Sequence, residues 1–136
     1  MRNSVVSVNN TAYGAGWAGD ACEEFTAPTV SFDEVVARCT EAVELVKIDA
    51  EGAEADILEG ASTAALARVR RFVLVYHDSF VTGSLARCER VLIGAGFHCT
   101  TRRDPFRAGL GILFAARDLA TVVKPTTHRR AAAVRD

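Results

Sequence analysis

The sequence VKIDAEGAE, residues 46–54, leads from an apolar segment through an acid-rich turn into a helical pattern. The apolar segment Val43 to Ile48 is typical of a buried strand, and it ends at Asp49. After Gly52, apolar residues recur at helical spacing: Ala53, Ile57, Leu58 and Ala61. The stretch therefore predicts a strand, a tight turn and a helix, the repeating unit of α/β folds with a parallel sheet.

The same alternation continues downstream. Ser62 is placed to cap a short second helix, and Phe72 to Tyr76 is another apolar strand, which stops at His77. A further set of apolar residues has helical spacing: Leu85, Cys88, Val91, Leu92 and Ala95. Gly94 and Gly96 mark the end of that helix. We therefore predict a parallel β-α-β-α-β run.

The flanking segments complete the predicted fold. Ser31-Phe-Asp-Glu34 has capping-box spacing and predicts a helix start. The apolar face of that helix is expected to hold Phe32, Val35, Val36 and Cys39. Val5 to Val8 predicts a short strand, followed by a long loop from Asn9 to Thr26. At the other end, Phe97 to Arg102 and Gly111 to Ala116 predict an antiparallel pair that closes the sheet edge.

Composition limits the classes of protein to consider. The chain has 136 residues, a net charge of −1 and 49% hydrophobic residues, which predicts one globular domain over residues 1–117 and a disordered tail over residues 118–136. The balanced charge argues against nucleic acid or an anionic membrane as a partner, and the short apolar runs favour a cytoplasmic protein. Four scattered cysteines without a C-x-x-C pair predict reduced packing residues, with neither a disulfide framework nor a zinc site.

Polar residues follow two of the predicted strands. Asp49 and Glu51 come after the first, and His77 ends the second. In open α/β sheets the ligand crevice lies beyond the carboxyl ends of the strands, so we expect the imidazole to lie beside one of the acids. Such a group can act as a general base or hold a divalent cation, whereas the simpler alternative is that the acids only favour a helix N-terminus.

Two other polar features have simpler interpretations. Lys47 shares a strand face with Asp49, which predicts an ion pair. Gly14 to Gly19 spells G-x-G-x-x-G, but it neither follows a strand directly nor precedes a helix, so we interpret it as a flexible active-site loop and not as a dinucleotide-binding turn.

The segment at residues 46–54 resembles the signature K-I-D-x-E-G-x-E of FkbM-type methyltransferases. The resemblance extends to residues 28–34 and 57–61, to Tyr76-His77 and to the turn at residues 94–97, and covers about residues 3–116. Val75 is a departure, because the family usually has an acid there.

This resemblance implies a Rossmann-like class I fold and S-adenosylmethionine-dependent methylation of a hydroxyl on a small molecule or sugar. It implies Asp49, Glu51 and His77 as catalytic residues, with no metal assigned and the cofactor-binding residues unknown. It also implies that the chain begins after the glycine-rich first turn of the domain. We therefore expect the chain to correspond to the second half of the domain and to bind the cofactor weakly by itself.

Several alternatives remain open at this point. The chain can be a gene remnant, the product of a misassigned start codon, or a half-domain completed by a partner chain. A remnant would act as a non-catalytic interaction module, pairing or self-associating through the exposed sheet edge near residues 3–8. A weaker alternative is a metal-dependent hydrolase, whose ligands would be Asp49, Glu51, Glu54 and His77.

Overall fold

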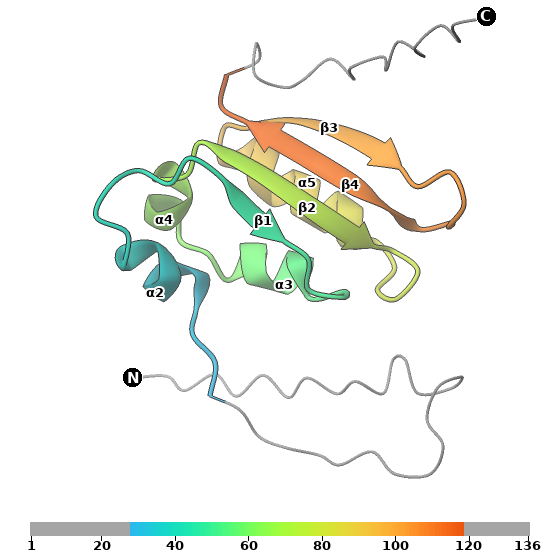
Figure 1. Ribbon diagram of the computed structural model, residues 1–136, viewed down its shortest axis with the longest axis horizontal. Helices are drawn as coiled ribbons and strands as arrows, with labels where there is room; N and C mark the ends of the chain where they lie inside the picture. The colour runs from blue at the N-terminus through green and yellow to red at the C-terminus, as the bar shows by residue number, and fades with distance from the viewer. Residues whose placement is uncertain (1–27, 119–136) are drawn as a thin grey trace, which may run out of the picture.

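The computed structural model describes residues 28–118, and the predicted strand at Val5–Val8, the predicted loop at Asn9–Thr26 and the tail beyond residue 118 lie outside them. In chain order the described elements are α2 (Phe32–Ala37), β1 (Val46–Ile48), α3 (Glu54–Glu59), α4 (Thr63–Ala67), β2 (Arg71–His77), α5 (Ser84–Gly94), β3 (His98–Arg103) and β4 (Leu110–Ala116) (Figure 1). Each of these elements was predicted from the sequence to within a few residues.

The strands form one mixed sheet in the order β1-β2-β4-β3. β1 and β2 are parallel, with Ile48 opposite Leu74, and β4 runs antiparallel to both of its neighbours. The predicted antiparallel pair is confirmed. However, β4 lies between β2 and β3. The strand β3 therefore runs in the same direction as β2 but does not pair with it.

The helices α3 and α5 pack against each other and against the same side of β2 (Figure 1). Alternate residues of β2, namely Phe72, Leu74 and Tyr76, are buried beneath them. They meet Leu58 of α3 and Leu92 of α5 in one apolar core. This arrangement places the carboxyl ends of β1 and β2 side by side at one edge of the sheet.

The other face of the sheet is less well covered. Val73 and Val75 of β2 are only half-buried, as are Ile112 and Phe114 of β4. Among residues 28–118, no helix packs on this side of the sheet as α3 and α5 do on the other. No helix in this part of the chain has the length and apolar character needed to cross a membrane.

The helix α2 confirms one local prediction and corrects another. The Ser31 hydroxyl accepts from the Glu34 amide, and the Glu34 carboxylate accepts from the Ser31 amide, which is the predicted capping box. Cys39 and Val35, expected on the apolar face, are exposed. The helix ends at Ala37, so Cys39 lies beyond its last turn and cannot share the buried side.

The strand β1 is shorter than predicted, and the cysteines differ in burial. Val43 forms only an isolated bridge with Val69, and regular pairing starts at Val46. Cys88 is buried and Cys99 half-buried, as expected for packing residues, whereas the exposed Cys39 departs from that prediction. Cys22 lies outside the described residues.

Candidate functional site

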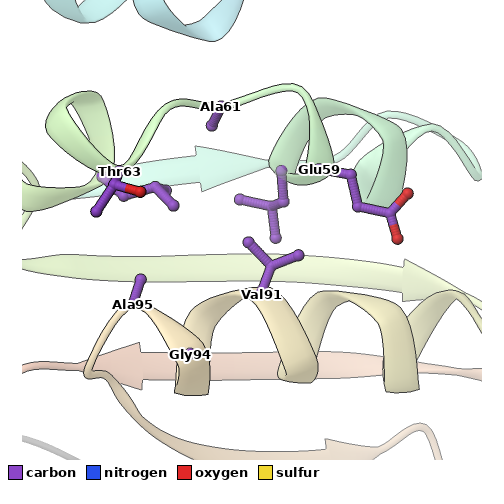
Figure 2. Close-up of a pocket in the computed structure, with 8 residues that line it drawn as sticks. Glu59, Ala61, Thr63, Val91, Gly94 and Ala95 are labelled. Carbon is purple, nitrogen blue, oxygen red and sulfur yellow. The ribbon is translucent and has the colours of Figure 1, made fainter.

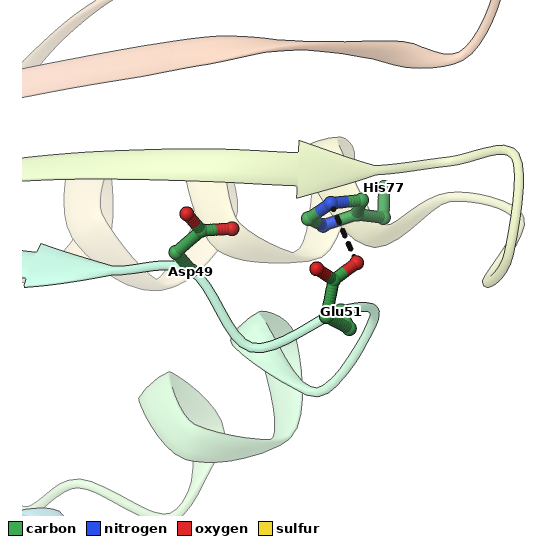
Figure 3. A group of neighbouring side chains, drawn as sticks. All are labelled: Asp49, Glu51 and His77. Carbon is green, nitrogen blue, oxygen red and sulfur yellow. Dashed lines mark ion pairs between the residues drawn. The ribbon is translucent and has the colours of Figure 1, made fainter. Parts of the chain in front are cut away.

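Three predicted site residues come together at the ends of β1 and β2. Asp49 directly follows β1, Glu51 lies in the turn behind it, and His77 is the last residue of β2 (Figure 3). One potential ligand atom of each side chain lies within 4.8 Å of the other two. The two strands are parallel neighbours, so their carboxyl ends meet, which is the arrangement that the sequence predicted.

The turn between β1 and α3 has an unusual backbone. Glu51 has φ of 52° and Gly52 has φ of 106°, so two successive residues adopt positive φ. Non-glycine residues occupy this region at a cost of about 1 kcal/mol or more. The turn directs the Glu51 carboxylate toward His77, whose Nε2 lies 3.2 Å from Glu51 Oε2.

Gly52 is required by both conformation and space. A Cβ atom added there would lie 3.0 Å from Cγ2 of Val81, in the loop that follows β2. The main chain of this turn therefore packs closely against the segment that carries His77. This close approach holds the two halves of the site at a fixed separation.

Glu54, the first residue of α3, is fully buried beneath the turn. Its Oε1 accepts hydrogen bonds from the amides of Ala50 at 3.0 Å and Gly52 at 3.1 Å. Its Oε2 accepts a further hydrogen bond from the Gly52 amide. Oε1 also lies 2.8 Å from Nδ1 of His77. The carboxylate therefore ties the turn after β1 to the end of β2.

This contact fixes the role of one ring nitrogen of His77. A carboxylate only accepts hydrogen bonds, so Nδ1 of His77 carries the proton that Glu54 accepts. Nε2 lies 3.2 Å from Oε2 of Glu51, at the open side of the site, and a proton on Nε2 would be donated to that carboxylate. The imidazole is also held in plane by Phe80, whose ring stacks on it at a centroid distance of 5.3 Å.

Two further charged side chains lie next to the site, and each has a partner. Nζ of Lys47 lies 2.9 Å from Oδ2 of Asp49, which confirms the predicted ion pair. Asp78, next to His77, accepts from the amide of Leu85 at 2.9 Å and so caps the start of α5. Asp78 therefore stabilises the helix and does not join the three site residues.

Two surface hollows lie away from these residues. A shallow groove of about 270 Å³ runs between the ends of α3 and α5, where Val91 and Ala95 face Ala61 and Thr63 (Figure 2). A second hollow of about 460 Å³ lies at the opposite end of the strands, where basic and acidic side chains line it: Glu44, Arg70, Arg71, Arg117 and Asp118. The site itself is an open rim, in which the Asp49 and Glu51 side chains are 38% and 59% exposed.

Sequence reasoning missed the role of Glu54. It was interpreted as a first-turn acid or as a fourth metal ligand, but its carboxylate faces Nδ1 of His77 and two amides, away from the three clustered ligand atoms. One signal was present, because an acid two residues after a glycine turn is well placed to accept the amides of that turn. The juxtaposition of Asp49, Glu51 and His77 is confirmed, and their chemical roles stay predictions.

Comparison with known proteins gives a consistent family match. The family model described as the methyltransferase FkbM domain matches residues 4–99. The chain is 36% identical over 94 residues to 31-O-demethyl-FK506 methyltransferase FkbM of Streptomyces tacrolimicus, covering 68% of the chain and 35% of that protein. It is 38% identical over 72 residues to the AMB antimetabolite synthetase AmbE of Pseudomonas aeruginosa, covering 51% of the chain and 3% of the synthetase. No solved structure matches.

Proposed function

Because this chain belongs to the FkbM methyltransferase family, we propose that it takes part in methyl transfer from S-adenosylmethionine to a hydroxyl group of a small molecule or sugar. The name of the Streptomyces relative assigns its methyl group to an oxygen of demethyl-FK506, which supports an oxygen acceptor here. The chain spans about a third of that relative. One observation carries the proposal, namely that the family signature at residues 46–54 supplies the acids that meet His77.

Methylation of a hydroxyl needs the acceptor oxygen to be oriented and relieved of its proton. In the proposal, the exposed carboxylates of Asp49 and Glu51 accept the hydrogen bond of the acceptor and so orient it. His77 acts through Nε2, either as the base that takes the proton or as a ligand of a cation that makes the hydroxyl more acidic. Both roles use the tautomer that Glu54 selects.

Three amides in the described turns at this edge already have carboxylate partners. The amides of Ala50 and Gly52 after β1 are already bound by Glu54, and the amide of Leu85 at the start of α5 is bound by Asp78. These amides are therefore not available for the carboxylate or ribose of S-adenosylmethionine. We assign residues 28–118 to the acceptor side of the reaction, and we expect the 136-residue chain alone to bind the cofactor weakly.

The test uses the gene product as its own cells make it, purified through an affinity tag. Transfer of a labelled methyl group from S-adenosylmethionine is measured with a panel of sugars and hydroxylated natural products. We expect labelling of at least one hydroxyl compound, and a loss of at least a hundredfold in Asp49→Ala and His77→Ala.

The matched control is Glu41→Gln, which removes one exposed acid outside the site. It is expected to keep the wild-type rate. Equal rates for wild type, Asp49→Ala and His77→Ala would show that these residues have no part in the reaction. Labelling of nitrogen compounds alone would contradict the hydroxyl acceptor.

A further inference from the structure

We propose that Asp49, Glu51 and Nε2 of His77 bind one divalent cation of the magnesium or manganese type. The inference deepens the proposed function. Only the role of the cation, which would be to hold and polarise the acceptor hydroxyl, rests on that function. Binding of the cation itself is a property of this chain and can be measured without methyl transfer.

The distances place the three donors within reach of one ion. Their ligand atoms lie within 4.8 Å of one another. Around Mg²⁺, with ligands at about 2.0–2.1 Å, neighbouring ligand atoms are about 3 Å apart. Nε2 of His77 and Oε2 of Glu51 are already 3.2 Å apart, so only the Asp49 carboxylate has to move closer. The exposed carboxylates can make this adjustment by side-chain rotation.

An independent observation comes from behind the histidine. Histidines that bind metals commonly donate their second ring N–H to a carboxylate, which fixes the ring and presents the other nitrogen. Here the fully buried Glu54 lies 2.8 Å from Nδ1 of His77, whereas Nε2 lies 3.2 Å from Oε2 of Glu51. Glu54 is not one of the three ligands, so its contact with His77 supports the cation site independently of the distances between the ligand atoms.

The same geometry favours a ligand over a base. A base must lie about 2.6–3.2 Å from the hydroxyl oxygen whose proton it takes. Nε2 of His77 already has Glu51 Oε2 at 3.2 Å. A hydroxyl could reach Nε2 only by displacing Glu51, whereas a cation between them would be bound by both.

The charge balance of the rim also favours a cation. Three carboxylates lie around His77, belonging to Asp49, Glu51 and Glu54. The positive group that faces them from β1 is Lys47, which pairs with Asp49. Arg87 of α5 is bound to Asp56 and Glu59 on the exposed side of α3. A divalent cation would offset the excess negative charge.

The donor set selects the type of cation. Two carboxylate oxygens and one imidazole nitrogen suit magnesium and manganese, which complete six coordination positions with water or substrate oxygens. The open rim leaves these positions accessible. A closed structural zinc site would need four protein ligands, commonly with cysteine, and the group found among residues 28–118 contains no cysteine.

The experiment uses Mn²⁺ alone with the purified 136-residue chain. Free Mn²⁺ is followed by its electron paramagnetic resonance signal during titration, in the absence of cofactor and acceptor. We expect saturable binding of one Mn²⁺, competed by Mg²⁺. Glu51→Gln is expected to weaken it at least tenfold, and so is Glu54→Gln if the metal uses His77. Glu41→Gln is expected to bind as wild type does.

The outcomes separate this inference from the proposed function. Glu51 is exposed, so Glu51→Gln should keep the fold, and circular dichroism of each variant verifies this. Absence of saturable binding at millimolar Mn²⁺, or equal binding by Glu51→Gln, overturns the cation site and leaves His77 as the proposed base. Binding of Mn²⁺ by a protein that methylates no hydroxyl compound keeps the site and overturns the function.

Discussion

Oε1 of Glu54 lies 2.8 Å from Nδ1 of His77, and both side chains are buried where β1, α3 and β2 meet. The carboxylate also accepts hydrogen bonds from two backbone amides of the turn that carries Glu51. One buried charge thus holds the Nδ1 side of the histidine and the path of the turn. The stability of the fold and the geometry of the site therefore depend on the same residue.

The first prediction concerns Glu54→Gln. The amide side chain retains one acceptor oxygen and brings an NH₂ group against N–H donors, so at least one of them loses its partner. We expect the free energy of unfolding to fall by about 3 kcal/mol, as for a broken buried pair. Urea denaturation measures it, with Glu41→Gln expected within about 0.5 kcal/mol of wild type. Equal stability of the two variants would contradict the role of Glu54.

A second prediction compares two glycines. Gly52→Ala introduces a Cβ 3.0 Å from Val81 at a φ of 106°, so we expect a loss of about 2 kcal/mol or more. Gly94, the last residue of α5, has no heavy atom within 4 Å of the added Cβ. Gly94→Ala should therefore be neutral or stabilise by about 0.5 kcal/mol. Thermal unfolding of both variants checks the contrast, which fails if the two shift alike.

The meeting of Asp49, Glu51 and His77 was predictable because it follows from local patterns and one general rule. Both β1 and β2 were visible in the sequence as apolar runs, and the carboxyl ends of parallel neighbours lie at the same edge of a sheet. The position of β4 between β2 and β3 was not predictable in this way. Apolar periodicity tells which face of a strand is buried, but the choice of neighbour depends on packing of the whole sheet.

The limits of the site prediction have a similar cause. Glu54 at the first turn of α3 is equally compatible with an exposed acid that favours the helix dipole. Its burial depends on His77, which lies 23 positions away in the sequence. The positive φ of Glu51 could not be predicted from the sequence either, because glycine is the residue normally expected in that conformation. Both features arise from tertiary contacts.

A third prediction concerns pH and the link between α3 and α5. Arg87 of α5 binds Asp56 and Glu59 of α3, and its hydrogen bond lowers the pKa of Glu59 below 4.5. Because the folded pKa is the lower one, the contribution of this pair to stability is present above the unfolded pKa. It is lost as pH falls through the folded value.

The variant Arg87→Gln should therefore be less stable than wild type at about pH 6, and the difference should shrink toward about pH 3. Urea midpoints at several pH values measure this. The control Arg102→Gln removes an exposed arginine of β3 and is expected to show no such trend. A difference between Arg87→Gln and wild type that stays constant over this range would contradict the link to Glu59.

A fourth prediction concerns thiol reactivity. Burial raises the pKa of Cys88 to about 11, and burial likewise raises the pKa of Cys99 to about 11. Cys39 is exposed. In a Cys22→Ser background at about pH 8, we expect iodoacetamide to modify Cys39 much faster than the other two, because only the thiolate reacts. Peptide mass spectrometry identifies the sites, and fast labelling of Cys88 in the folded chain would contradict its burial.

The last prediction uses Lys47 to test which acid holds the proposed cation. Its Nζ lies 2.9 Å from Oδ2 of Asp49, and the two side chains are 62% and 38% exposed. Exposed ion pairs contribute at most about 1 kcal/mol to stability, so Lys47→Met should remain folded. The ammonium nevertheless competes for the carboxylate that the cation needs.

Removing a unit charge at this range should favour Mn²⁺ by about 1 kcal/mol, or roughly fivefold in affinity. The gain should shrink at about 1 M salt, where screening acts over about 3 Å. The same titration of free Mn²⁺ measures it, with Arg102→Gln as the control for loss of a distant positive charge. Unchanged or weaker binding by Lys47→Met would show that the cation does not use Asp49, because a ligand freed from its competing partner must bind more tightly.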